Sequence, residues 1–228
     1  MNFDFLPKYY MLFLDGTKYT ILIAVFAVLF GILLGILFSL MRLSKVKVLN
    51  CIATVYIEFV RGTPLLVQLY IIYFGLPKLG INFPEIEAFG SSFPDVMAGI
   101  IAMSLNSGAY VAEIIRSGIQ SVDKGQMEAA RSLGMGSSMA MRYVVLPQAI
   151  RNILPALGNE FVTIIKDSSI TSVIGIHELM YNADTVRGNT FRPFEPLIIA
   201  ALIYFVLTFT VSSLLHIFER RLSLSDRG

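Results

Sequence analysis

The order of apolar and polar stretches along the chain predicts five membrane-spanning helices. A spanning helix needs about 20 mostly apolar residues, and the clearest such stretch lies between Lys18 and Arg42, with no charge inside it. A second clean stretch lies near the C-terminus, and three stretches between them carry isolated polar residues. The predicted spans are residues 18–42, 51–76, 95–115, 150–167 and 197–218. We therefore expect an all-α membrane protein with a single transmembrane domain over residues 1–228.

The distribution of basic residues predicts how these spans are oriented. When the connecting segments are assigned to alternate sides, 12 of the 18 Lys and Arg residues follow span one, lie between spans three and four, or follow span five. Basic residues concentrate on the cytoplasmic side, so the N-terminus is expected outside and the C-terminus inside. Residues 1–17 have neither a basic start nor a small-residue cleavage site, which indicates a retained segment rather than a signal peptide.

Composition excludes several classes of function. Hydrophobic residues make up 55% of the chain and charged residues 15%, against about 25% charged in soluble domains. A disordered chain, a nucleic-acid-binding domain and an ordinary cytosolic enzyme are thereby excluded. The only cysteine, Cys51, has no partner for an internal disulfide. We find no phosphate-binding loop, no catalytic group and no metal constellation, so this chain is expected to bind no cofactor itself.

The segment of residues 120–147 is too polar to be a span, yet it has a regular pattern. Ser121 is expected to cap a helix over residues 123–133, which Gly134 and Gly136 would end. A second helix would start at Ser137 or Ser138 and stop at Pro147. A membrane protein does not need such a hairpin merely to return to the bilayer. The pattern therefore favours a docking element for a cytoplasmic partner.

The residues of this hairpin match a known pattern. Glu128-Ala129-Ala130, then Gly134, then the string Val144-Val145-Leu146-Pro147 resemble the EAA loop of ABC import permeases, with valine at 144 where the family usually has isoleucine. Strings elsewhere resemble the permeases for polar amino acids, the histidine, glutamine, arginine and opine group: residues 61–68, 106–110 and 166–169. The resemblance covers about residues 19–218.

This resemblance implies a non-enzymatic translocation subunit in a prokaryotic inner (plasma) membrane. Its partners would be an ATPase subunit that uses ATP and Mg, a second permease chain in a homo- or heterodimer, and an extracytoplasmic amino-acid-binding protein, with no nucleic acid involved. The ATPase-coupling residues implied by the family are Glu128, Ala129, Ala130, Gly134, Leu146 and Pro147.

Polar residues fall near the centres of three different predicted spans. A charge at such a depth costs about 2.5–3.5 kcal/mol on insertion scales, so each one needs a functional reason. Arg61, Asn106 and Glu160 mark the centres of spans two, three and four. We interpret this common level as the substrate site. Its candidate residues are Glu58, Arg61, Thr63, Gln68, Asn106, Glu160 and Thr163.

Span two is expected to break at Arg61-Gly62-Thr63-Pro64, with Thr63 as cap and Pro64 as the first helical residue. The following half-helix would then direct its partly positive N-terminus at the membrane midplane. Arg61 would either bind a substrate carboxylate or pair with Glu58 three residues away.

Glu160 would either bind a substrate ammonium group or pair with Arg61 in the resting state. Glu58, Arg61 and Glu160 together carry one negative charge, which favours a basic amino acid such as arginine, lysine or histidine. The alternative from another class is a stand-alone proton-coupled secondary carrier that uses Glu160 as its proton site. In such a carrier the EAA hairpin has no role.

Overall fold

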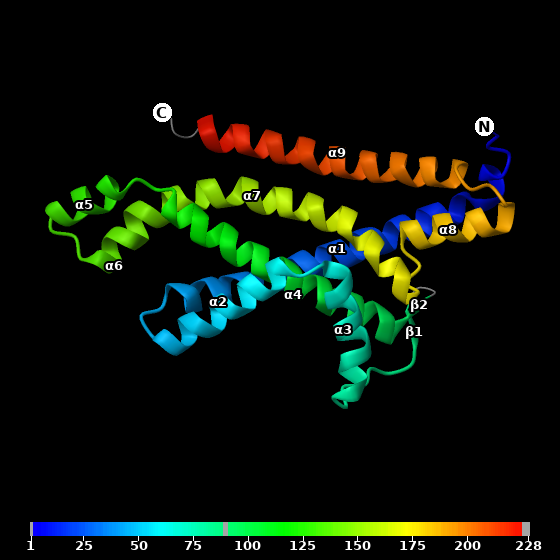
Figure 1. The fold of residues 1–228 in the computed structure, drawn as a ribbon. Helices are drawn as coiled ribbons and strands as arrows, with labels where there is room; N and C mark the ends of the chain where they lie inside the picture. The colour runs from blue at the N-terminus through cyan, green and yellow to red at the C-terminus, as the bar shows by residue number, and fades with distance from the viewer. Residues whose placement is uncertain (1, 89–90, 225–228) are drawn as a thin grey trace.

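The computed structural model describes residues 2–88 and 91–224, and nearly all of them are helical (Figure 1). The helices are α1 (Leu6–Leu43), α2 (Lys47–Gly62), α3 (Leu65–Lys78), α4 (Phe93–Gln120), α5 (Lys124–Ser132), α6 (Ser137–Ala140), α7 (Leu146–Asp167), α8 (Leu179–Thr190) and α9 (Glu195–Leu224). A π-helical turn (Met141–Val145) joins α6 to α7, and a 3₁₀ helix (Ser168–Ile174) follows α7.

The core forms where α1 and α4 pack closely along their lengths. Small residues make this approach possible: a Cβ atom on Gly31 would lie 2.7 Å from Ser107 Oγ, and one on Gly35 would overlap the side chain of Val111. Ala24 and Ala27 of α1 are fully buried at the same interface. The spacing of the two glycines is the small-xxx-small pattern that lets helix backbones approach in membranes.

Three described helices, α1, α4 and α9, are each long and apolar enough to cross a membrane. A fourth candidate is the pair α2 and α3, which is bent by 113° at its break. The predicted fourth span coincides with α7, but this helix carries Arg151, Glu160, Lys166 and Asp167 and is not apolar enough to qualify by composition. The described residues thus give three or four candidate spans, and the count of five and the orientation stay predictions.

The hairpin region contains two helices as predicted, but both helix boundaries differ. Asp123, not Ser121, caps α5, because its carboxylate accepts a hydrogen bond from the Gly125 N–H at 2.6 Å. The second helix does not stop at Pro147. It continues through the π-helical turn into α7, and Pro147 is the second residue of α7, directly after that turn.

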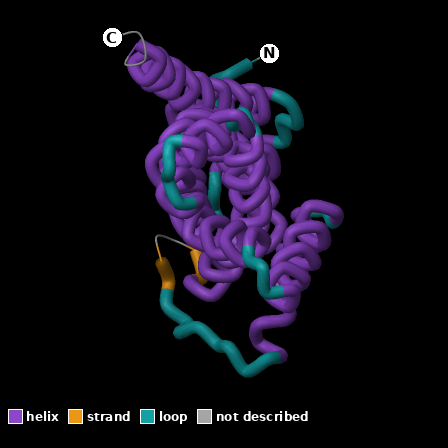
Figure 2. The backbone as a smooth tube through the Cα atoms, turned by 90° about the vertical axis from the view of Figure 1, so that its left-hand side faces the viewer, coloured by secondary structure: helices purple, strands orange, loops and turns teal. Residues whose placement is uncertain are grey.

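Two segments between the candidate spans contain further secondary structure. The short helix α8 lies between α7 and α9. The loop over residues 77–94 contains two strands, β1 (Glu87–Ala88) and β2 (Ser91–Ser92), which pair antiparallel at the edge of the helical body (Figure 2). The α5–α6 hairpin lies at one end of the molecule, and α8 with the N-terminus lies at the other (Figure 1).

Candidate functional site

The break between α2 and α3 lies at the predicted residues. Pro64 has no N–H and restricts the residue before it to extended backbone, and Thr63 is extended at φ −119° and ψ 149°. Thr63 ends α2, while Pro64 is the N-cap of α3, so the first helical residue is Leu65 rather than Pro64. The chain turns here by 113°, far more than a kink within one span.

Three of the predicted site residues form one buried polar network at this break. Gln68, which is 8% exposed, donates from Nε2 to the carbonyl oxygens of Val60 at 2.7 Å and Thr63 at 3.0 Å. Asn106 of α4 donates from Nδ2 to Gln68 Oε1 at 3.0 Å. Because a buried amide without partners is costly, these bonds fix the bend of the α2–α3 pair against α4.

Arg61 lies apart from this network. Its Nη1 is 4.0 Å from Glu113 Oε2, and its guanidinium carbon lies 5.6 Å from the centre of the Tyr110 ring. Glu113 follows Asn106 by seven residues on α4, which is about 10 Å along a helix axis. The Arg61 side chain is therefore displaced by about two helical turns from the level expected for it.

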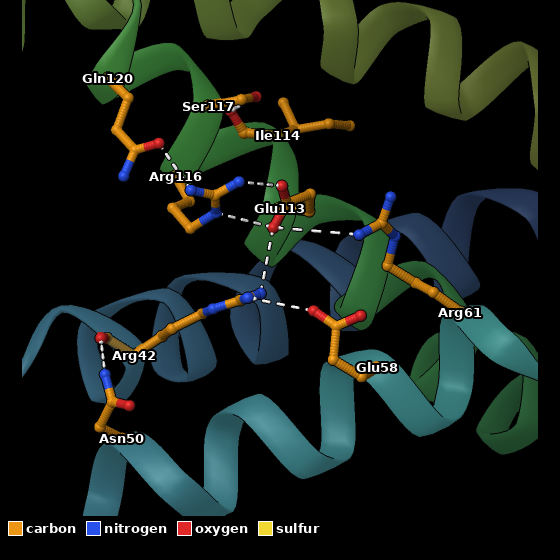
Figure 3. Close-up of polar contacts among 9 residues, drawn as sticks. All are labelled: Arg42, Asn50, Glu58, Arg61, Glu113, Ile114, Arg116, Ser117 and Gln120. Atoms are coloured by element: carbon orange, nitrogen blue, oxygen red, sulfur yellow. Dashed lines mark hydrogen bonds and ion pairs between the residues drawn. The ribbon is translucent and has the colours of Figure 1, made fainter. Parts of the chain in front are cut away.

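Glu113 is the centre of a charge cluster that the sequence reasoning missed (Figure 3). Its carboxylate accepts hydrogen bonds from Arg42 Nη1 at 3.1 Å and from Arg116 Nε at 2.9 Å. Arg42 also donates to Glu58 at 3.0 Å. Glu58 is therefore paired with Arg42, and of the two alternatives for Arg61 the pair with Glu58 is not present among the described residues. Arg42 lies at the end of α1, close enough to α2 to reach Glu58. The three-residue spacing of Glu113 and Arg116 was the available signal.

Glu160 of α7 is buried close to Ser107 of α4. It is 8% exposed, and among the described residues its carboxylate makes no ion pair, so it is not paired with Arg61. Ser107 is the residue that directly follows Asn106 in α4. The Ser107 hydroxyl lies near the Glu160 carboxylate, but it makes no hydrogen bond of normal geometry in the described part of the chain. Thr163 is exposed, and its hydroxyl donates to Asn159 O at 3.1 Å.

The EAA residues lie on an accessible surface. Glu128, Ala129, Gly134, Leu146 and Pro147 are exposed, whereas Ala130 is 5% exposed and packs inward. Gly134 has φ +88° and ends α5 in a Schellman motif, in which its N–H donates to Arg131 O at 3.0 Å and the Met135 N–H donates to Ala130 O at 3.2 Å. The turn therefore requires the glycine that the pattern placed there.

This fold, with apolar helices, a sharply bent helix pair and an exposed hairpin, is that of a membrane transport subunit. The family described as "Binding-protein-dependent transport system inner membrane component" matches residues 12–224, and the chain belongs to it. Members of this family are membrane transport components rather than enzymes. Because the family depends on a binding protein, a stand-alone carrier is not favoured.

Relatives with known names agree with this assignment. A putative glutamine transport system permease protein of Rickettsia bellii is 42% identical over 98% of this chain and 100% of its own length. An arginine transport system permease protein of Bacillus subtilis is also 42% identical, over 99% of this chain and 100% of its own length. A crystal structure described as an amino acid ABC transporter with histidines matches with a TM-score of 0.87 and 53% identity, covering 97% of this chain and 100% of that one.

Proposed function

We propose that this chain is the permease subunit of an ATP-driven importer for basic amino acids. It crosses a prokaryotic inner membrane five times, with its N-terminus outside. A second permease chain completes the translocation pathway with it. A separate ATPase subunit uses ATP and Mg and acts through the EAA hairpin, and an extracytoplasmic binding protein delivers the amino acid.

The observation that carries this proposal is the exposed α5–α6 hairpin in a chain of the binding-protein-dependent family. Leu133 at its tip is 86% exposed and Tyr143 is 64% exposed. Apolar side chains presented to solvent beside exposed Glu128 and Ala129 favour a protein partner there. A cleft in the ATPase subunit is the partner that the EAA pattern predicts.

The environment of Glu160 supports a cationic substrate. Glu160 is buried without an ion pair and without a full set of hydrogen-bond donors among the described residues, so a cation from outside the chain would stabilise its charged form. The neighbouring Asn106 amide and Ser107 hydroxyl supply neutral hydrogen-bonding groups at the same level. The guanidinium of arginine, the side-chain ammonium of lysine or the imidazolium of histidine meets this requirement. Named relatives transport glutamine or arginine, and the charge of Glu160 favours the latter class.

One face of α7 supports a second permease chain. Asn159, Thr163 and Lys166 are exposed and lie within two turns of one another. Polar side chains within a span avoid lipid and face protein or a water-filled cavity. A second permease chain opposite α7 would cover this face and enclose the pathway.

The experiment that tests the proposal measures ATP hydrolysis by the assembled complex in lipid nanodiscs. Each of the common amino acids is added with the cognate binding protein at saturating concentration. Arginine, lysine or histidine is expected to stimulate hydrolysis severalfold over the unloaded binding protein. Stimulation by glutamine alone would contradict the basic specificity, and uptake by the chain alone with a proton gradient would contradict the ATP-driven mechanism.

A further inference from the structure

The exposed surface of α4 is confined to one face near its C-terminal half. Of the described residues of α4, only Tyr110, Ser117 and Gln120 are exposed. Tyr110 and Ser117 are seven residues apart, about two helical turns, so they lie on the same side of the helix. A hollow of about 440 Å³ beside Ser117 is lined on the α7 side by Ala156. Glu160 follows Ala156 by one helical turn. The open face of α4 therefore borders a groove that leads along α7 to Glu160.

Residues of opposite charge lie near the two ends of this face. Glu160 of α7 lies close to Ser107. Arg61 of α2 approaches from the other side: its guanidinium carbon is 5.6 Å from the centre of the Tyr110 ring, and its Nη1 is 4.0 Å from Glu113 Oε2. Ser107 and Glu113 are six residues apart, which is about 9 Å along α4. An anionic and a cationic side chain thus lie beside points of α4 that are separated by this length.

The charge cluster that contains Arg61 has one surplus positive charge. Its members are three arginines and two glutamates: Arg42, Arg61, Arg116, Glu58 and Glu113 (Figure 3). The Glu113 carboxylate already accepts hydrogen bonds from Arg42 and from two nitrogens of Arg116. Among the described residues Arg61 donates no hydrogen bond, and one of its terminal nitrogens points away from Glu113 (Figure 3). Arg61 is therefore the cation of this cluster whose donors are still available.

An amino acid supplies the anion that Arg61 lacks. A charged side chain within a membrane-spanning region needs a partner of opposite sign, and arginine binds carboxylates through two parallel hydrogen bonds. Every amino acid has an α-carboxylate. In extended arginine or lysine, six bonds of about 1.5 Å each place the carboxyl carbon about 7–8 Å from the centre of the terminal cation. Such a molecule matches the face of α4 in the signs of its two charges and has a comparable length.

We propose that Arg61 binds the α-carboxylate of the substrate and that Glu113 is the residue that positions Arg61. Glu113 is itself fixed by two other arginines, and it holds the Arg61 guanidinium beside Tyr110 without using its donors. Glu160 binds the cationic end of the same molecule. The inference rests on the proposed function, to which it adds the carboxylate end of the site. It also favours arginine and lysine over histidine, whose side chain is shorter.

The test compares two ligands that differ only in the carboxyl group. Labelled arginine and agmatine, which is arginine without its carboxyl group, are bound to the nucleotide-free complex. The nanodiscs contain only phosphatidylcholine, so that no anionic lipid competes for Arg61. The wild type is expected to bind arginine at least tenfold more tightly than agmatine. In Arg61→Gln the two affinities are expected to agree within about twofold, because only arginine binding weakens. An unchanged ratio of affinities, or an equal loss for both ligands, overturns the inference.

Further variants separate positioning from folding. Glu113→Gln is expected to lower the ratio of arginine to agmatine affinity and to leave agmatine binding unchanged, whereas a merely structural role would weaken both ligands. If this variant does not assemble, Glu113→Asp, which shortens the side chain by one CH₂ group, is expected to lower the ratio in the same way. Arg61→Lys keeps the charge and retains part of the ratio. Arg187→Gln, at a half-buried arginine of α8, is the control. A wild-type ratio in the Glu113 variants overturns the positioning role.

Failure of the proposed function gives a different result. If glutamine with its binding protein stimulates ATP hydrolysis and arginine does not, the basic specificity fails. The same comparison is then made with glutamine and its decarboxylated form, 4-aminobutanamide. A ratio of affinities that depends on Arg61 still supports the carboxylate role in that case. Binding of neither arginine nor glutamine by the wild-type complex overturns both the specificity and the inference.

Discussion

Two buried carboxylates, Glu160 and Glu178, are stabilised in different ways. Glu178 is fully buried at the N-cap of α8, where it accepts hydrogen bonds from the N–H groups of Met180 at 2.9 Å and Tyr181 at 2.7 Å. The Tyr204 hydroxyl donates a further bond at 2.8 Å. Glu160 has only the Ser107 hydroxyl and no comparable set of donors among the described residues. The first is a structural group, and the second is available to a ligand.

Glu178 makes the stability of the chain depend on pH. Burial raises the pKa of this carboxyl, which lies outside the candidate spans, to about 7, although hydrogen bonds from Met180, Tyr181, Tyr204 and Thr20 oppose the rise. The folded chain then binds more protons than the unfolded chain between about pH 4.5 and 7. Stability is therefore fully present below this range and falls by up to about 3 kcal/mol as the pH rises through 7.

Replacement of Glu178 by glutamine is expected to remove this slope. The amide still caps α8 through its oxygen but does not ionise. Thermal unfolding of the detergent-purified chain between pH 5 and pH 8 measures the effect. Glu85→Gln, at an exposed residue of the α3–α4 loop, is the control and keeps the wild-type slope. A slope that persists in Glu178→Gln assigns the pH dependence to another group.

Replacement of Glu160 by glutamine tests the substrate role of that carboxylate. Loss of the charge removes a charge-assisted bond to a substrate cation, which is worth about 1.5–3 kcal/mol. We expect kcat/KM for arginine uptake by the reconstituted complex to fall at least tenfold, while the ATPase stays bound. Asp167→Asn, seven residues further along α7, is the matched control with near-normal uptake. Equal uptake by the wild type and Glu160→Gln would remove Glu160 from the site.

At the scale of elements, the hairpin depends on one backbone conformation. Gly134 has φ +88°, whereas Gly136, two residues on, has φ −64°, and a β-carbon on either would meet no neighbour within 4 Å. Gly134→Ala therefore forces alanine into the left-handed region at a cost of about 1–2 kcal/mol, and the angle between α5 and α6 changes. Gly136→Ala is free of this strain.

We expect Gly134→Ala to reduce transport per ATP hydrolysed by severalfold, while binding of substrate is retained. Gly136→Ala is expected to resemble the wild type. The measurement is the ratio of uptake to ATP hydrolysis in proteoliposomes. Equal ratios for the two variants would show that the geometry of this turn does not serve coupling.

The elements were largely predictable from local signals, but their angles were not. Thr63-Pro64 marks the break in span two because proline restricts the residue before it. The 113° bend, however, is fixed by bonds from Gln68 to the α2 end and from Asn106 to Gln68, which join residues 38 positions apart. Likewise, Arg42 meets Glu58 and Glu113 only because three helices converge. The hydrophobic pattern of a single segment does not predict contacts between residues so far apart in the sequence.

At the scale of the whole molecule, the proposed function requires that α7 crosses the membrane. Its 22 residues are about 33 Å long, which matches a hydrocarbon core of about 30 Å. Its charged residues make it unsuitable as an isolated span, so it crosses only if protein or water covers its polar face. The α5–α6 hairpin precedes α7 and α8 follows it, so the sides on which these two elements lie answer the question.

Cysteine labelling decides between the two topologies. Cys51 is the only cysteine and is exposed, so Cys51→Ser gives a background in which Leu133→Cys and Phe191→Cys, at residues 86% and 92% exposed, each add one thiol. A membrane-impermeant maleimide is expected to label position 191 in right-side-out vesicles and position 133 only in inverted vesicles. Labelling of both from the same side would mean that α7 does not cross, and the hairpin and the α8–α9 turn would then face the same compartment.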